Sequence, residues 1–532
     1  MIRADALVVG AGHNGLVAAI LLARAGRHVV VLERSAEPGG AIRTAEVTLP
    51  GFHHDLYATN LNLFMGSRFF AELGGELVEH GFEMARADRP FGSAFPDGEF
   101  VGVSTDAETT DASIRSRSTH DADEWKRLTA RFERIAPHLF PLLGAPMPSA
   151  ALVRSLLTGR RALGRQWPYE LARLTAQSTR ELTETHFESR EVQALVAAWG
   201  MHLDFPPDAP GGALFAFLES FASAAHGMTL GRGGARSLVD SLVSLLRHYG
   251  GELICNAEVA RIRVRGGRAT GVQVSDGTSY EAPTVIGNLT PTGLAALVDP
   301  GLLGPAVKHY RYAPGTLMVH LALDEPAPWL AGDAVSEHAY VHIGPYLEDM
   351  SLAYTRAAGG YLPERPTLVV GQPTSVDPTR APEGKHILWI QARVVPGTIR
   401  ADAADEIDAR SWDSAKEPFA DRVVSLVEEL APGLRDNILG RFVISPADLE
   451  RANPNLVGGD HLAGSMHPAQ FFFLRPLAGW SRYRTPVEGL YLCGAATWPG
   501  AGVGAGSGYL LAKSLLQKRR RPAFSHVVGR AV

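Results

Sequence analysis

The chain has 532 residues, of which 45% are hydrophobic and 20% are charged, and its formal net charge is −5. This length and composition predict a globular protein of at least two domains and exclude an intrinsically disordered one. The negative charge gives no overall attraction to phosphate backbones, so we expect no nucleic-acid partner.

Two cysteines, Cys255 and Cys493, are present, and no C-x-x-C spacing could form a redox-active dithiol. No apolar run approaches the roughly 18 residues of a membrane-spanning helix. The first residues predict a buried strand, because they lack the basic region and cleavage site of a secretory leader. We expect a cytoplasmic protein and leave a peripheral membrane contact open.

Residues 6–9 predict a strand and residues 16–25 a helix, with the turn GAGHNG between them. In a nucleotide-binding strand–turn–helix unit, such glycines permit the tight turn, the approach of backbone to a pyrophosphate and close helix–strand packing. The residues of this turn that we expect to bind the cofactor are Gly10, Gly12, His13, Asn14 and Gly15.

Glu33 follows a second predicted strand, 28–32, at the spacing of an acid that binds an adenosine ribose. This acid strongly disfavours the alternative that the glycines merely build a turn. The combination predicts an α/β fold with a Rossmann-type domain.

A paired glycine follows Glu33 and would let backbone pass close to a pyrophosphate and a ribityl chain. Nearby arginines could neutralise phosphate charge. The residues expected to bind here are Arg34, Gly39, Gly40, Ala41 and Arg43. This extension favours FAD over NAD and resembles the flavoprotein group that includes amine oxidases and phytoene desaturases. Many members have an arginine where this chain has Ala41.

The middle of the chain predicts helices over 124–143, 148–163 and 169–185. Apolar residues alternate with arginines over 139–167, as in an interfacial helix that binds a membrane. A helical cap packed on its own domain, with solvated arginines, is at least as well supported by the same pattern.

A further helix begins at 233–237, and residues 252–262 predict a pair of strands. Turns at 266–267 and 276–277 continue this hairpin toward a strand at 282–288 that returns to the nucleotide domain. Strand composition recurs farther along the chain, at 316–322, 367–370 and 386–394. These three strands predict a sheet that forms the floor of a second domain.

Near the other end, residues 489–495 predict a strand, followed by a glycine-rich loop and a helix over 509–517. Small residues let backbone approach a flat ring, and the helix end can stabilise negative charge on a reduced flavin. A merely flexible loop would not normally be bracketed by a strand and a helix. The residues expected to contact the flavin are Gly494, Ala495, Gly502, Val503 and Ala505.

The stretches 10–19, 233–242 and 471–504 together resemble phytoene desaturase-like FAD-dependent oxidoreductases. The similarity is greatest to the branch that contains pyridine nucleotide-disulphide oxidoreductase domain-containing protein 2. The resemblance implies that Val259 contacts the adenine. Members often have histidine where this chain has Trp498, which puts a histidine-dependent step at that position in doubt. Trp498 and His461 are expected to line the active site.

The resemblance also implies a domain organisation. We expect a discontinuous FAD-binding domain formed by 1–65, 230–295 and 470–520. We expect a discontinuous α+β substrate domain with a helical cap, formed by 66–229 and 296–469, and a tail at 521–532.

The expected reaction is dehydrogenation of a C–C bond in a lipophilic, isoprenoid-like or polyketide-like substrate by hydride transfer to FAD, with oxygen or a quinone as electron acceptor. A flavin-dependent amine oxidase, a redox-neutral isomerase on reduced FAD and a non-catalytic flavin-stabilised binding protein remain alternatives. We expect no metal and either a monomer or a homodimer. No catalytic base is identified, although five residues near the flavin motifs could reach the ring: His53, His54, Asp55, His461 and His467.

Overall fold

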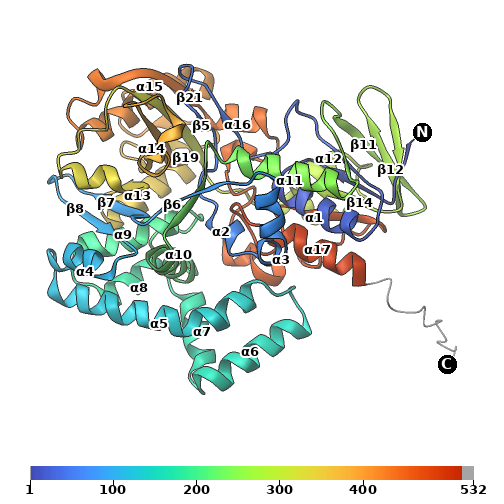
Figure 1. The fold of residues 1–532 in the computed structure, drawn as a ribbon, viewed down its shortest axis with the longest axis horizontal. Coiled ribbons are helices and arrows are strands. Elements are labelled where there is room, and N and C mark those ends of the chain that lie inside the picture. The colour runs from blue at the N-terminus through green and yellow to red at the C-terminus, as the bar shows by residue number, and fades with distance from the viewer. Residues whose placement is uncertain (1, 518–532) are drawn as a thin grey trace.

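The computed structural model describes residues 2–517 (Figure 1). The expected tail at 521–532 and the last three residues of the expected FAD-binding segment 470–520 lie outside the described residues. Within the described part, no helix has both the length and the apolar character needed to cross a membrane.

One sheet has five parallel strands. Its order is β10 (Glu252–Ile254), β3 (Val29–Leu32), β2 (Ala6–Val9), β14 (Val285–Asn288) and β22 (Leu490–Cys493). The central strands are continuous apolar runs because a parallel sheet is buried on both faces. The expected strands at 6–9, 28–32, 282–288 and 489–495 are therefore confirmed, each within a few residues.

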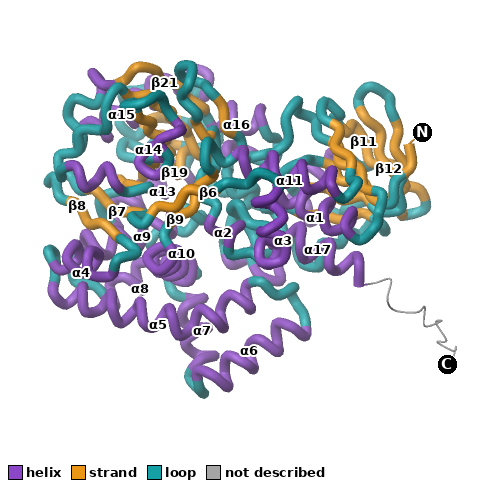
Figure 2. Tube along the Cα trace, viewed as in Figure 1, coloured by secondary structure: helices purple, strands orange, loops and turns teal. Residues whose placement is uncertain are grey.

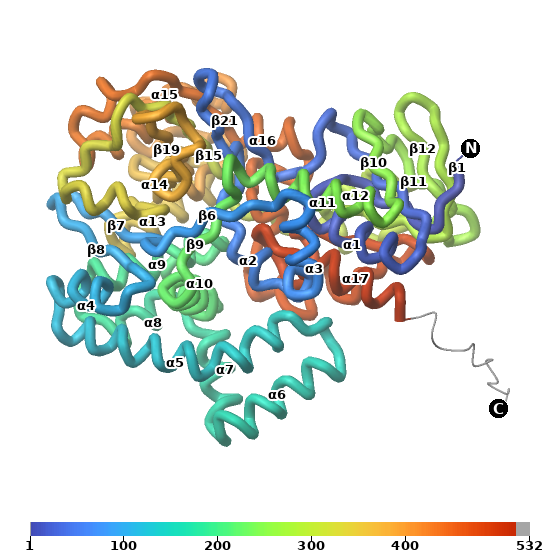
Figure 3. Tube along the Cα trace, in the orientation of Figure 1, coloured from blue at the N-terminus to red at the C-terminus, as the bar shows by residue number. Residues whose placement is uncertain are grey.

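Three helices pack together beside this sheet, namely α1 (His13–Arg24), α11 (Arg236–His248) and α17 (Gly506–Gln517). Figure 3 shows the blue start and the red end of the chain side by side here. The contact between α1 and α17 is close, because a Cβ atom at Gly508 would lie 2.1 Å from the carbonyl oxygen of Asn14. The two ends of the sequence thus form one structural unit.

The predicted strand pair within 252–262 is wrong. β10 instead joins β3 in the parallel sheet, whereas β11 (Val259–Arg265) pairs with β12 (Arg268–Val274). Asn256 takes a left-handed conformation, with φ of 52°, and turns the chain between β10 and β11. The turns at 266–267 and 276–277 are confirmed, and β13 (Ser279–Glu281) and β1 (Ile2–Arg3) complete this four-stranded sheet.

A second large sheet has seven strands and is mostly antiparallel (Figure 1). Its order is β21 (Ile438–Ile444), β15 (Gly315–Leu323), β19 (His386–Val395), β18 (Thr367–Gly371), β16 (Tyr340–Ile343), β7 (Phe91–Ala94) and β8 (Phe100–Val103). The expected strands at 316–322, 367–370 and 386–394 are confirmed as β15, β18 and β19.

A helical layer lies along one side of this sheet, drawn in purple in the lower left of Figure 2. It comprises α4 (Ala107–Arg115), α5 (Thr119–Leu143), α6 (Ala150–Leu163), α7 (Trp167–Ala176), α8 (Thr179–His186), α9 (Arg190–Met201) and α10 (Gly212–His226). The single helix expected over 169–185 is wrong, since α7 and α8 occupy this span. Ser178 and Glu181 form a capping box that starts α8 separately.

The remaining elements connect these layers. They are α2 (Asn62–Met65), α3 (Arg68–Glu79), α12 (Pro291–Ala296), α13 (Leu347–Ala358), α14 (Pro373–Val376), α15 (Trp412–Glu428) and α16 (Pro446–Ala452), with the short strand pairs β4 (Thr44–Ala45) and β5 (His54–Asp55), β6 (Met84–Ala87) and β9 (Met228–Gly231), and β17 (Tyr361–Leu362) and β20 (Ala401–Asp402). Side chains of α15 pack against the face of the seven-stranded sheet opposite the helical layer.

Candidate active site

A continuous cavity of about 480 Å³ joins the two large sheets. At one end it is lined by the carboxyl ends of β2, β3, β14 and β22, through residues such as Gly10 and Glu33. At the other end it reaches the seven-stranded sheet at Trp389 and Arg393. We call the first end the nucleotide groove and the second end the chamber. Ligands of open parallel sheets typically bind at the carboxyl ends of the strands.

The glycine turn of the nucleotide groove has little free space. Gly10 has a φ of +95°, which favours glycine. A Cβ atom at Gly12 would lie 2.7 Å from Asn288 Nδ2, and one at Gly15 would lie 2.5 Å from the Gly10 carbonyl oxygen. No side chain caps the start of α1. The uncapped N–H groups of this helix can therefore face an anion in the groove.

Glu33 lines the groove and is held by backbone groups of its own motif. Its carboxylate accepts hydrogen bonds from the N–H groups of Ala11, at 2.8 Å, and Ser35, at 2.9 Å. Each carboxylate oxygen can accept a further hydrogen bond. The carboxylate is thus oriented and can still accept hydrogen bonds from sugar hydroxyls.

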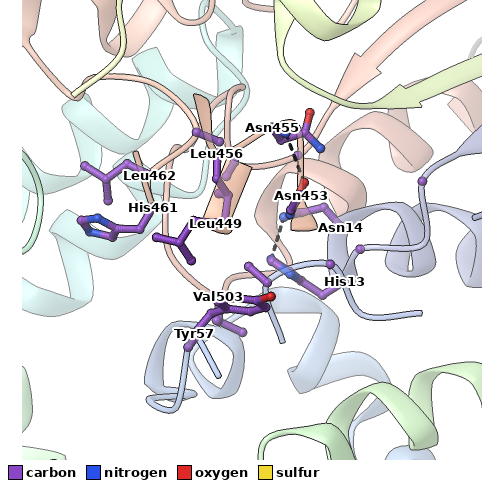
Figure 4. Close-up of a pocket in the computed structure, with 18 of the residues that line it drawn as sticks. His13, Asn14, Tyr57, Leu449, Asn453, Asn455, Leu456, His461, Leu462 and Val503 are labelled. Atoms are coloured by element: carbon purple, nitrogen blue, oxygen red, sulfur yellow. Dashed lines mark hydrogen bonds between the residues drawn. The ribbon is translucent and has the colours of Figure 1, made fainter. Parts of the chain in front are cut away.

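Asn14 links the two ends of the sequence within the groove. Its Oδ1 accepts from the Gly508 N–H at 3.0 Å, and its side-chain amide bonds His13 Nε2 at 2.9 Å (Figure 4). Burial lowers the pKa of His13 to about 4, so the imidazole is neutral near pH 7. A neutral His13 adds no charge to the groove.

The structure places most of the expected cofactor-binding residues along the cavity. Those that line it are Gly10, Gly12, His13, Asn14, Glu33, Arg34, Gly40, Ala41, Arg43, Val259, Gly494, Ala495, Gly502 and Val503. Gly15, Gly39 and Ala505 do not line it. Gly39 instead packs the turn, because a Cβ atom there would lie 2.4 Å from the Ile42 carbonyl oxygen.

Trp498 does not line the cavity, contrary to the sequence-based expectation. Its side chain is fully buried and packs against Phe471 and Phe472. The indole N–H donates to the Ala145 carbonyl at 2.8 Å. This tryptophan therefore ties the carboxyl-terminal loop to the segment after α5. His461, the other expected lining residue, does face the cavity.

The remaining base candidates, His53, His54, Asp55 and His467, also lie outside the cavity lining. Asp55 is 2% exposed and forms an ion pair with the buried Arg380 at 2.9 Å. It also accepts from the Ala235 N–H at 2.8 Å. These contacts give Asp55 a structural role between segments distant in the sequence.

The chamber contains functional candidates that sequence analysis missed. They are Tyr57, Trp199, His202, Glu219, Met318, Tyr340, Trp389, Gln391 and Arg393. The rings of Tyr340 and Trp389 stack with centroids 5.7 Å apart. The sequence contains a signal for Gln391 and Arg393, because these two polar residues alternate within a strand that is otherwise apolar from Ile387 to Val395.

The ionisable side chains of the chamber are largely buried, and burial shifts their pKa values. Arg393 is 6% exposed, and burial lowers its pKa to about 10, so it stays cationic at neutral pH. Burial, together with the Arg393 charge, holds the pKa of His461 well below its usual range. Burial also raises the pKa of Glu219 to about 7. Among residues 2–517, no group of His, Cys, Asp and Glu side chains could hold a metal ion.

Comparisons with known proteins agree with this architecture. The family model described as "Flavin containing amine oxidoreductase" matches residues 15–507. Pyridine nucleotide-disulfide oxidoreductase domain-containing protein 2 of Rattus norvegicus is 31% identical over 95% of this chain and 92% of that protein.

Two bacterial relatives extend the comparison. A limonene dehydrogenase component of Castellaniella defragrans is 27% identical, over 97% of this chain and 95% of that protein. Hydroxyneurosporene desaturase of Cereibacter sphaeroides is 28% identical, over 93% and 94%. Both similarities extend across the two sheets.

Among solved structures, cyclohexylamine oxidase of Brevibacterium oxydans shares the fold with a TM-score of 0.56 at 14% identity, covering 97% of this chain and all of that one. The family match, the sequence relatives and the shared fold converge on one assignment. This chain belongs to the flavin containing amine oxidoreductase family and is a flavoprotein oxidoreductase.

Proposed function

We propose that the cofactor is FAD, with its adenosine and pyrophosphate in the nucleotide groove and its flavin ring at Gly494–Val503. The crowded turn at Gly12 and the oriented carboxylate of Glu33 support this proposal, because they form a groove that suits a pyrophosphate and a ribose. When bound, FAD supplies a hydride acceptor.

We infer that the chain dehydrogenates a C–C bond of a lipophilic, isoprenoid-like or polyketide-like substrate. The observation that carries this inference is the chamber itself, which continues from the flavin end of the cavity between aromatic walls such as Trp199, Tyr340 and Trp389. Such walls suit an apolar substrate held beside a cofactor. The names of the limonene and hydroxyneurosporene relatives add support from sequence.

Amine oxidation fits the chamber less well. Arg393 keeps a buried positive charge that no carboxylate among residues 2–517 pairs with. An ammonium group entering the chamber would be repelled by this charge. The electrostatics around Arg393 therefore favour a neutral or anionic group at that end of the chamber.

Glu219 is our candidate for the group that accepts the substrate proton. It lies on α10 and lines the chamber, and burial raises its pKa to about 7. A carboxyl with that pKa can be ionised at neutral pH and can hold a proton afterwards. Removal of a hydride and a proton from neighbouring carbons leaves the double bond of the product.

Anaerobic mixing of the FAD-loaded protein with candidate substrates tests the proposal. Bleaching of the flavin with an alkene product supports dehydrogenation, whereas release of ammonia would replace it with amine oxidation. Product formed only after prior reduction would indicate isomerisation, and no turnover with any substrate would favour a binding protein. Reoxidation by oxygen compared with a soluble quinone identifies the electron acceptor.

We also propose that α6 contacts a membrane from one side. Gly159 is the single buried residue of this helix, while Val153, Leu156 and Leu157 are 38–56% exposed. Exposed arginines, including Arg160 and Arg161, lie near these apolar side chains in sequence. Apolar and cationic groups together suit an anionic lipid surface.

A further inference from the structure

Strand β19 presents two different faces. Leu388, Ile390 and Ala392 pack into the apolar cluster that contains α15. Because side chains alternate along a strand, Trp389, Gln391 and Arg393 point to the other face, and all three line the chamber. The chamber wall is therefore a row of three side chains with polar atoms.

Each member of this row has a buried polar atom without a hydrogen-bond partner among the described residues. These atoms are Trp389 Nε1, Gln391 Oε1 and Arg393 Nε. The three side chains are only 3–6% exposed. Buried polar groups are normally satisfied, and three unsatisfied ones on the side chains of one cavity wall are consistent with a polar ligand beside this wall.

The guanidinium of Arg393 has a specific pair of free donors. It carries five N–H groups. Nη1 donates one N–H to the His202 carbonyl oxygen at 3.1 Å and the other to His461 Nε2. Neither hydrogen of Nη1 is therefore free. Nη2 donates to His202 Nδ1 at 3.3 Å. One Nη2–H and the Nε–H remain, and such a pair matches the two oxygens of a carboxylate.

Histidines surround Arg393 as neutral acceptors. Because an arginine can only donate, His461 Nε2 must accept, and Nδ1 then donates to Thr316 Oγ1 at 2.8 Å. His202 Nδ1 likewise accepts, so its Nε2–H donates to His342 Nε2 at 3.0 Å. Neither histidine supplies negative charge.

Two other buried arginines have donors satisfied by groups of the protein. Arg380, which is 0% exposed, has Asp55 at 2.9 Å and Asp377 at 3.4 Å. Arg475, also 0% exposed, has no ion pair but donates to three backbone carbonyl oxygens. Arg393 has no such acid within residues 2–517. A buried charge without a partner is unfavourable, and a bound anion would remove that cost.

We propose that the substrate carries a carboxylate, which pairs with Nε and Nη2 of Arg393 while its apolar body lies along the chamber. This inference rests on the proposed function and narrows it to oxygen-bearing, polyketide-like or acyl-chain molecules rather than pure hydrocarbons. Gln391 and Trp389 lie about 7 and 13 Å farther along the strand, where they meet further polar groups of the same molecule.

Equilibrium binding to the FAD-loaded protein tests the proposal without requiring turnover. The probes dodecanoate, dodecanol and dodecylamine are titrated into the protein at pH 8. The binding of each is measured from the change in flavin absorbance. We expect dodecanoate to bind about tenfold or more tightly than dodecanol. In R393M this preference should fall to about one, while dodecanol affinity stays the same. The R265M variant, which removes an exposed arginine on β11, should keep the preference.

Different outcomes overturn different claims. Equal binding of dodecanoate and dodecanol to the wild type removes the carboxylate inference but leaves dehydrogenation to be judged by flavin bleaching. Tightest binding of dodecylamine would also overturn it. If R393M weakens FAD binding or shifts the flavin reduction potential while the dodecanoate preference persists, Arg393 pairs with the flavin instead.

Discussion

The nucleotide groove and the chamber differ in whether the protein itself satisfies their buried polar groups. Glu33 in the groove is oriented by N–H groups two and 22 residues away in sequence. Arg393 in the chamber is contacted by residues up to 191 positions away and still has free donors. The carboxylate of the groove is thus satisfied within its own motif, whereas the chamber has buried polar atoms without a partner among the described residues.

The largest expected difference is between two buried arginines. Arg380→Met leaves Asp55 and Asp377 buried without a cation and should lower the unfolding free energy by about 3–5 kcal/mol. Arg393→Met removes a charge without a counter-charge and should leave stability unchanged or increase it. Melting temperatures of both variants at saturating FAD measure the contrast.

Equal destabilisation by the two substitutions would contradict the distinction. It would mean that the hydrogen bonds of Arg393 hold the fold as firmly as the ion pairs of Arg380. We do not expect equal destabilisation, because without Arg393 the proton of His461 can move from Nδ1 to Nε2. The neutral imidazole could then donate to the His202 carbonyl oxygen, 3.2 Å away.

Glu219 should make stability depend on pH. Its pKa in the folded protein, about 7, lies above the ordinary value of 4.5, so its contribution is present below about pH 4.5 and is lost as pH rises to about 7. Glu219→Gln should therefore be more stable than wild type at pH 8, by up to about 3 kcal/mol, and similar near pH 5. Urea unfolding at the two pH values measures this difference.

The same variant tests the catalytic proposal. If Glu219 accepts the substrate proton, the rate of flavin reduction should rise through about pH 7 in the wild type and be slow and flat in Glu219→Gln. An unchanged pH profile would assign Glu219 to the chamber wall only.

Two glycines in helices allow the effect of steric crowding on FAD binding to be distinguished from the effect of helix propensity. Gly15→Ala places a Cβ atom 2.5 Å from the Gly10 carbonyl oxygen and should raise the FAD dissociation constant about 10- to 100-fold. Gly75→Ala, in α3, meets nothing within 4 Å and should bind FAD normally. Fluorescence titration of the apoproteins gives both constants, and equal constants would show that the turn tolerates the methyl group.

The smallest effect on stability is expected at α6. Leu157 is 50% exposed, so Leu157→Glu should change the unfolding free energy by no more than about 0.5 kcal/mol while reducing co-sedimentation with anionic vesicles. Leu330, which is 54% exposed on another surface, provides the control variant Leu330→Glu. Wild-type protein that ignores vesicles would remove the membrane proposal.

Local patterns were sufficient to predict the strand–turn–helix unit of the five-stranded sheet. The turn Gly10–Gly15 and the acid Glu33 are close in sequence, and their spacing follows from one strand–turn–helix unit. The strands β15, β18 and β19 were also predictable, because each is rich in β-branched and other apolar residues. The pairing of β10 with β3 was not, since adjacent strands in sequence need not be neighbours in a sheet.

The sequence by itself was sufficient to predict the family and the α/β fold, because each motif that carries them consists of residues close together in sequence. Only the tertiary structure showed that Trp498 supports the loop from the core and that Trp389, Gln391 and Arg393 face the chamber. Whether a buried polar group is satisfied depends on atoms contributed by distant segments, and here His202, His461 and β19 meet around one guanidinium. The cofactor motifs were thus predictable from local spacing, whereas the carboxylate proposal depends on which buried groups the fold leaves without a partner.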